Sequence, residues 1–99
     1  MSTLREFTDA QSFKICTKAL RHIDQKEFVE AKKILEEGLA EFNQDSPLYF
    51  YHGVVLAALG EYDKSIESFQ HVINLKSKFT PSAKKNIEKV ILTKDFVSR

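Results

Sequence analysis

The side chains that could carry nucleophilic or metal-binding chemistry are few and widely spaced in this 99-residue chain. The sequence has one cysteine, Cys16, and three histidines, His22, His52 and His71. No two histidines stand at the i, i+4 spacing of a helical metal pair, and there is no second cysteine for a zinc site. We therefore expect no metal site and no cofactor.

Cys16 and His52 are the only candidates for a nucleophile and its general base, since they belong to segments expected to be neighbouring helices. The sequence offers no third group to orient the histidine and no oxyanion site. A cysteine among apolar neighbours usually behaves as a small hydrophobic residue, and a histidine on an apolar helix is usually packed. We expect no enzyme and no catalytic residues. The alternative, a hydrolase that uses Cys16, would be inactivated by a thiol alkylator.

Two groups of charged residues resemble binding sites. The acidic residues between positions 36 and 45 could form a metal cluster, but Lys32 and Lys33 precede them by about one turn, as on a solvated helix face. No arginine lies among the C-terminal lysines, and no aromatic residues on which bases could stack are interleaved with them. We therefore expect no nucleic-acid binding. The acidic residues are Glu36, Glu37, Glu41 and Asp45, and the lysines are Lys76, Lys78, Lys84, Lys85, Lys89 and Lys94.

The net charge of +1 conceals a gradient along the chain. Residues 1–23 carry 4 basic and 2 acidic side chains, residues 24–67 carry 4 and 10, and residues 76–99 carry 7 and 2. The composition, 42% hydrophobic and 29% charged, is typical of a folded helical protein. No segment is apolar and long enough to cross a bilayer, and the first residues lack an apolar signal core. We expect one cytoplasmic domain, residues 1–99, with no membrane partner.

Five segments show the apolar spacing of a helix together with residues that begin or end one. In the third segment, Ser46 is expected as the N-cap, Pro47 as the first helical residue and Gly60 as the end. Almost every residue between them is apolar, so this helix should lie at the centre and be buried on all sides. The expected helices begin near residue 9 or 12, 27, 46, 62 and 80, and end near residues 24, 42, 60, 75 and 96.

The last segment is expected to close the fold. Its apolar residues should face the rest of the protein, and its charged residues should face solvent. The apolar set is Ala83, Ile87, Val90, Ile91 and Phe96, and the charged set is Lys84, Lys85, Glu88 and Lys89.

Residues 34 positions apart resemble one another. Ser12, Ser46 and Thr80 each open a helical segment, and Pro47 and Pro81 follow two of them. A period near 34 with two helices per unit is typical of a stacked helical repeat. The same offset relates Phe28 to Tyr62, Ala31 to Ser65, Leu35 to Phe69 and Leu39 to Ile73.

These residues resemble the tetratricopeptide repeat family. Residues 46–79 match its pattern well, and residues 12–45 match it less well because Lys26 replaces the turn glycine and Asn43 the exit proline. Small residues such as Ala19, Gly38 and Gly53 would let neighbouring helices approach closely. The resemblance implies an all-α superhelix of two helix-turn-helix repeats, 12–45 and 46–79, and a capping helix, 80–96. The strong match rests on Tyr49, Gly53, Gly60-Glu61-Tyr62, Ser65 and Phe69.

In this family the first helix of each repeat lines a concave groove that binds partner peptides. Members that capture acidic chaperone tails use a clamp of Lys, Asn and Arg residues, and only one of five clamp positions, Lys85, is kept here. The resemblance therefore implies an apolar groove with a basic wall. We expect a small adaptor or chaperone, like those of bacterial secretion systems, that binds an apolar or amphipathic segment with an acidic flank. The expected contacts are Phe13, Cys16, Thr17, Leu20, Phe50, Tyr51, Val54, Lys84 and Lys85.

Two alternatives compete for the same apolar residues. They could be core residues covered by the N-terminal segment through Leu4 and Phe7, since two repeats are fewer than such stacks usually need. They could also be buried in a homodimer, which would make the chain a self-associating structural subunit of a larger assembly.

Overall fold

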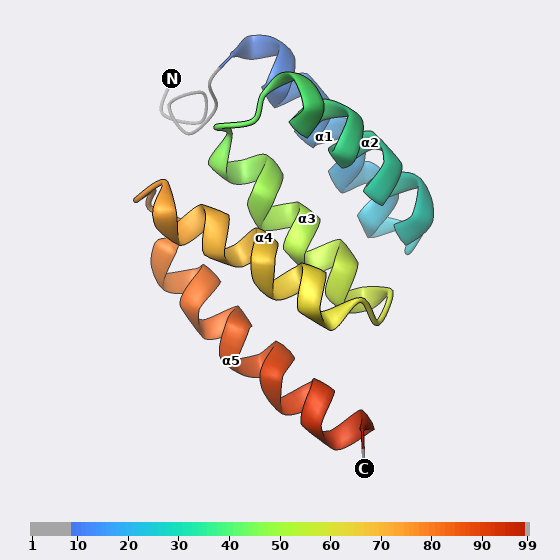
Figure 1. The fold of residues 1–99 in the computed structure, drawn as a ribbon. Helices are drawn as coiled ribbons and strands as arrows, with labels where there is room; N and C mark the ends of the chain where they lie inside the picture. The colour runs from blue at the N-terminus through green and yellow to red at the C-terminus, as the bar shows by residue number, and fades with distance from the viewer. Residues whose placement is uncertain (1–8, 99) are drawn as a thin grey trace.

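A computed structural model describes residues 9–98, which form five α-helices and no strand. The expected all-α architecture is confirmed over that range (Figure 1). No helix in this range has both the length and the apolar composition that a membrane span needs. The helices are α1 (Ala10–Asp24), α2 (Phe28–Glu41), α3 (Ser46–Ala58), α4 (Tyr62–Asn74) and α5 (Thr80–Val97).

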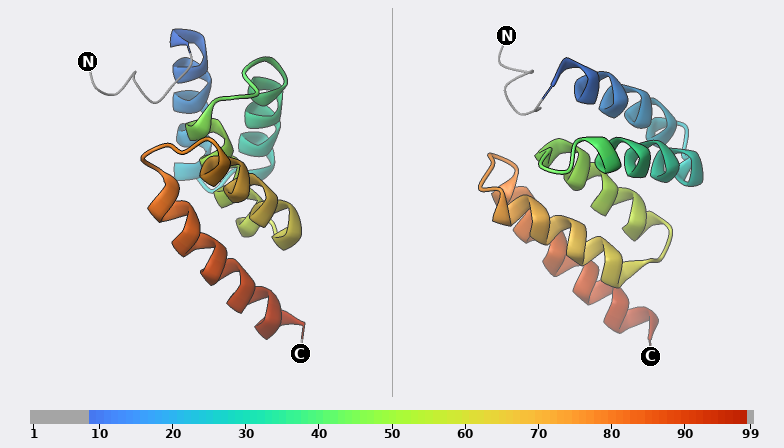
Figure 2. Two further views of the ribbon diagram at one scale, coloured as in Figure 1. Left: turned by 60° about the vertical axis from the view of Figure 1, so that its left-hand side comes forward. Right: turned by 45° about the horizontal axis from the view of Figure 1, so that its top comes forward.

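Each helix packs on the next one along the chain, and α1 also contacts α3. Figures 1 and 2 show α1 with α2 at one end of the fold, α5 at the other and α3 with α4 between them. This order is compatible with a helical repeat, because contacts fall between neighbours in sequence.

The central position of α3 follows from its apolar sequence. Leu48 and Val55 are fully buried in one core cluster with residues of α1 and α2. Phe50 and Val54 pack against a second cluster, built from α4 and α5. The expectation that α3 is buried on all sides is wrong, however, because Phe50, Tyr51 and Val54 stay partly exposed. The helix bridges two clusters that cover opposite sides of it, and the face between them is open to solvent.

Two glycines set the distance between helices. An added Cβ at Gly53 would lie 2.8 Å from the Phe69 ring of α4, and one at Gly38 would lie 2.8 Å from Ile15 of α1. The Ser65 hydroxyl of α4 also donates a hydrogen bond to the carbonyl of Gly53 at 2.7 Å. The packing role expected of these small residues is confirmed for Gly38, Gly53 and Ser65.

The helix starts agree with expectation to within one residue, but the capping residue of α3 differs. Asp45 is the N-cap of α3, because its carboxylate accepts the backbone N–H of Leu48, and Ser46 is the first helical residue. The Ser46 hydroxyl instead contacts that of Ser77 at 2.6 Å, which ties the start of α3 to the loop before α5. In α1 the N-cap is Asp9, one of the two expected starts, and Ser12 is the third helical residue, whose hydroxyl accepts the backbone N–H of Asp9 in a capping box.

The turns inside the two expected repeats share one backbone conformation. Lys26 has φ 62° and Gly60 has φ 80°, both in the left-handed region, and they lie 34 residues apart. Lys26 stands at the position of the turn glycine in the repeat pattern, and its positive φ agrees with that assignment. Glycine adopts this conformation without strain, whereas an L side chain clashes with its own backbone there.

The C-terminal part of α5 is more exposed than expected. Ala83 and Val90 are buried against α4, but the side chains of Ile91 and Phe96 are 43% and 77% exposed. Lys94 pairs with Asp63 near the start of α4, at 2.6 Å, so the residues after Lys94 have little of α4 left to pack against. Ile91 is turned about 100° from Val90 around the helix and so leaves the interface.

Replacing Lys26 with glycine should stabilise the fold. The substitution Lys26→Gly removes a left-handed strain of roughly 1–2 kcal/mol, partly offset by the extra freedom of glycine in the unfolded chain. We expect the free energy of unfolding in urea to rise by about 1 kcal/mol. The control Lys18→Gly, inside α1, should lower it by about 1 kcal/mol. Equal losses in both variants would contradict the turn geometry.

Candidate functional site

The nine residues expected to line one groove do not form a single surface. Cys16 is 1% exposed and belongs to the core cluster between α1 and α2. Thr17 and Leu20 are exposed on α1, and Phe13 is half-buried. The packing of α1, α2 and α3 therefore covers Cys16, so its side chain does not reach the surface where a partner was expected. The covering segment containing Leu4 and Phe7 lies outside the described residues.

The environment of Cys16 suppresses its ionisation. Burial raises the pKa of the thiol to about 12, and the nearby carboxylate of Asp45 acts in the same direction. Since the thiolate is the nucleophilic form, the thiol is unreactive near neutral pH.

His52 does not pair with Cys16. Its Nδ1 lies 2.7 Å from the hydroxyl of Ser68 in α4, and its Nε2 lies 3.0 Å from the carboxylate of Glu36 in α2. These are the residue types of a hydrolytic triad, but Ser68 is buried within α4, where the surrounding backbone N–H groups make helix hydrogen bonds. The three side chains therefore act as a polar link between α2, α3 and α4.

Phe79, an aromatic residue that the sequence pattern does not single out, packs against two of the expected groove residues, Phe50 and Tyr51. The ring of Phe79, in the residue before α5, lies 5.0 Å from that of Phe50 and 6.4 Å from that of Tyr51. Phe50 also contacts Phe69 edge to face, with ring centroids 5.6 Å apart. Position 79 lies 34 residues after Asp45, an N-cap, so the repeat pattern gives no signal for an aromatic residue there.

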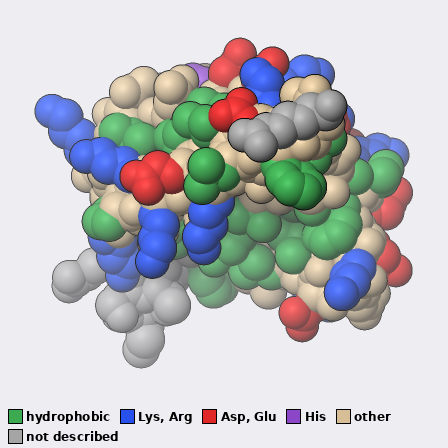
Figure 3. Space-filling model, turned by 90° about the horizontal axis from the view of Figure 1, so that it is seen from below, with side chains coloured by type: hydrophobic (Ala, Val, Ile, Leu, Met, Phe, Trp, Pro, Cys, Tyr) green, Lys and Arg blue, Asp and Glu red, His purple; other side chains and the backbone are tan. Residues whose placement is uncertain are grey.

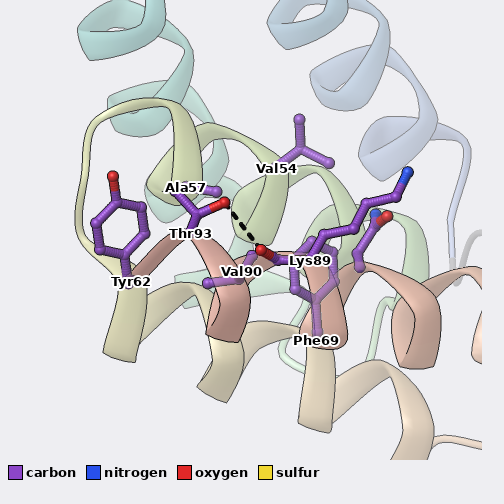
Figure 4. A pocket seen from close by; sticks show the side chains of 8 residues that line it. Val54, Ala57, Tyr62, Phe69, Lys89, Val90 and Thr93 are labelled. Atoms are coloured by element: carbon purple, nitrogen blue, oxygen red, sulfur yellow. Dashed lines mark hydrogen bonds between the residues drawn. The ribbon is translucent and has the colours of Figure 1, made fainter. Parts of the chain in front are cut away.

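A cavity of about 250 Å³ lies between α3, α4 and α5 (Figure 4). Val54 is the only member of the expected set that lines it, while Lys84 and Lys85 do not. The cavity is lined by Val54 and Ala57 of α3, Tyr62 and Phe69 of α4, and Asn86, Lys89, Val90 and Thr93 of α5.

The rotation of α5 explains which lysine reaches the cavity. Val90 is buried on α4, which places Asn86, Lys89 and Thr93 on the neighbouring face at i, i+3 and i+7. The Thr93 hydroxyl donates to the backbone carbonyl of Lys89 at 2.9 Å, so its hydrogen bond is made inside the helix (Figure 4). The same spacing is visible in the sequence once Val90 is taken as the core position.

The cavity lining is mainly apolar, with polar groups at one edge. Val54, Ala57 and Phe69 provide apolar surface, and Asn86 and Lys89 provide an amide and an ammonium group. A volume of about 250 Å³ is below the range of roughly 300–1,000 Å³ usual for small-molecule sites. Within residues 9–98, no three potential metal ligands come together. The cavity suits one or two side chains of a polypeptide better than a cofactor.

Comparison of the chain with protein-family models, with curated proteins and with solved structures finds no match in any of the three.

The buried thiol predicts how stability depends on pH. Above the unfolded pKa of 9.0 the unfolded chain loses the Cys16 proton while the folded chain keeps it, so the free energy of unfolding falls as pH rises from about 9 to 12. Burial also raises the pKa values of Tyr49 and Tyr51, which adds to the decline.

Urea denaturation between about pH 8 and pH 11 measures this decline. The variant Cys16→Ala should show a shallower decline, since the tyrosines still contribute to it. An identical pH dependence in both proteins would show that Cys16 ionises as easily in the folded state as in the unfolded chain.

Proposed function

We propose that this chain is a non-enzymatic protein-interaction module of the tetratricopeptide type. It binds an apolar or amphipathic segment of a partner protein in the concave groove between α3 and α5, as a small adaptor or a chaperone of the kind found in secretion systems. Three features support the proposal: the 34-residue repetition, the packing of successive helices and the repeated left-handed turn at Lys26 and Gly60.

The open cavity between α3 and α5 is the observation that carries the proposal. Its floor is apolar although it faces solvent, and desolvation of such a floor by a large side chain is the usual source of affinity at a protein interface. In the helix-in-groove mode, one face of an amphipathic helix places a few large side chains in such holes.

The charge of α5 supports an acidic flank on the partner. Lys84, Lys85 and Lys89 are exposed, and none makes an ion pair with a residue of the described range. Lys89 stands at the edge of the cavity, so a carboxylate next to the anchoring side chain would meet it there. Lys84 and Lys85 lie farther along α5 and would contribute to attraction at longer range.

Phe79 limits the length of the groove that a partner can use. It covers Phe50 and Tyr51 from within the chain, so the partner's contacts centre on Val54, Ala57 and Lys89. Phe13, Thr17 and Leu20 belong to α1 and do not line the cavity. They contribute only if the partner extends beyond it.

A displayed library of random peptides about twelve residues long tests the proposal. We expect the selected peptides to carry a large apolar residue close to Asp or Glu. Ala57→Trp, which fills the cavity, should weaken their binding at least tenfold in a calorimetric titration, and Lys89→Glu should weaken it several-fold.

Matched controls are available next to each position. Ala58 is exposed and directly follows Ala57, so Ala58→Trp should bind like the parent protein, and Lys84→Glu should have a smaller effect than Lys89→Glu. Circular dichroism verifies that each variant is folded. Undiminished binding by a folded Ala57→Trp variant would place the binding site elsewhere.

A further inference from the structure

Most of the exposed large apolar side chains lie on α5. Leu92, Phe96 and Val97 of α5 are 69%, 77% and 62% exposed, and Val29 of α2 is 69% exposed. Figure 3, which views the molecule from the side of α5 in Figure 1, shows exposed hydrophobic side chains beside a group of Lys and Arg side chains. Large apolar groups at such exposure are typical of surfaces that bind another protein.

On α5 these residues form a stripe with a definite order. Lys85, Lys89, Leu92 and Phe96 stand at i, i+4, i+7 and i+11, the spacing of one helix face, and all four are exposed. Basic residues occupy the first half of the stripe and apolar residues the second. We call these four residues the α5 stripe.

The outer face of α2 carries a stripe with the same spacing. Val29, Lys33, Glu36 and Ala40 also stand at i, i+4, i+7 and i+11, are exposed and border one shallow depression. The apolar Val29 comes first, followed by the basic Lys33, and the second half holds one acidic residue, Glu36, with Glu37 beside it. We call Val29, Lys33, Glu36 and Ala40 the α2 stripe.

We infer that the α2 stripe of one copy of this chain binds the α5 stripe of another, with the two helices antiparallel. In this register Phe96 meets Val29 and Leu92 meets the aliphatic stem of Lys33. Glu36, which also contacts His52 within its own chain, meets Lys89, and Lys85 lies over the small Ala40. Each stripe spans 11 residues, about 16 Å, so all four pairs form together.

Other pairings of the same faces are less favourable. A parallel α2–α5 register sets Lys33 against Lys89 and Glu36 against Leu92. When two α5 stripes pack in parallel, each lysine faces a lysine. When they pack antiparallel, both lysines face apolar residues and no carboxylate is present. The charges of the whole chain agree with the mixed pairing, because residues 24–67 are acidic and residues 76–99 are basic.

In this interface the α2 stripe of one copy binds the α5 stripe of the next, so each copy uses two different surfaces. A dimer would leave one stripe of each kind unpaired, and further copies therefore add to form rings or open chains. The interface is independent of the proposed groove, except that Lys89 belongs to both surfaces. One helix face on another is a small contact, so association should be weak and should strengthen at low ionic strength.

Sedimentation velocity over a range of concentrations tests the interface in the full chain at low and high ionic strength. We expect the mean mass of the natural protein to rise with concentration beyond that of a dimer, and to rise less at high salt. Val29→Asp and Phe96→Asp, both at exposed positions away from the groove, should each be monomeric. Lys18→Asp, on the exposed face of α1, should behave like the natural protein.

Mixing the two monomeric variants is the decisive step. Phe96→Asp keeps an intact α2 stripe and Val29→Asp keeps an intact α5 stripe, so an equal mixture should form a 1:1 dimer and stop there. A natural protein that stays monomeric, a dimer that survives both substitutions or a mixture that remains monomeric would each overturn the inference. The inference would also be overturned if the protein did not self-associate but bound anionic phosphatidylserine vesicles, and if Phe96→Asp abolished that binding.

Discussion

The close contact between the backbone of Gly53 and the ring of Phe69 is the constraint on which the rest of the structure depends. A methyl group at Gly53 would lie 2.8–2.9 Å from three atoms of the Phe69 ring, so α3 and α4 reach this separation only with glycine there. The Ser65 hydroxyl donates a hydrogen bond to the Gly53 carbonyl, which opposes sliding of α4 along α3. The Phe69 ring also supports α5, because it lies in one core cluster with Ala83 and Val90.

The groove follows from this contact. With Phe69 held against Gly53, α4 forms a floor from which α3 and α5 rise on either side. Phe79 packs against Phe50 of α3, and a cavity of about 250 Å³ lies between α3, α4 and α5. On the opposite side of α3, Leu48 and Val55 join the fold to α1 and α2, where His52, Glu36 and Ser68 add a polar link between helices. The side chains that could take part in catalysis thus hold helices together, and the cavity between α3, α4 and α5 is lined mainly by apolar residues.

The sequence predicts the helices well because apolar spacing and turn residues are local signals. Even the replacement of the turn glycine by Lys26 is recognisable from the 34-residue offset, and the backbone confirms it. Other features depend on tertiary structure or on a choice between neighbours. Asp45 and Ser46 are adjacent and both suit an N-cap. The position of Phe79 depends on the path of a loop, and the exposure of Phe96 depends on where α4 begins relative to the end of α5. The rotation of α5, which selects Lys89 rather than Lys84, is set by tertiary packing of Val90.

The most direct test of the binding groove is nuclear magnetic resonance of the methyl groups in a complex with one selected peptide. The groove places the peptide's large apolar side chain between α3 and α5, so nuclear Overhauser contacts should join it to the methyl groups of Val54, Ala57 and Val90. Methyl groups of the opposite cluster, such as those of Leu35, should show none. Contacts confined to Val29 and Leu92, with none to Val54 or Ala57, would contradict the proposed site.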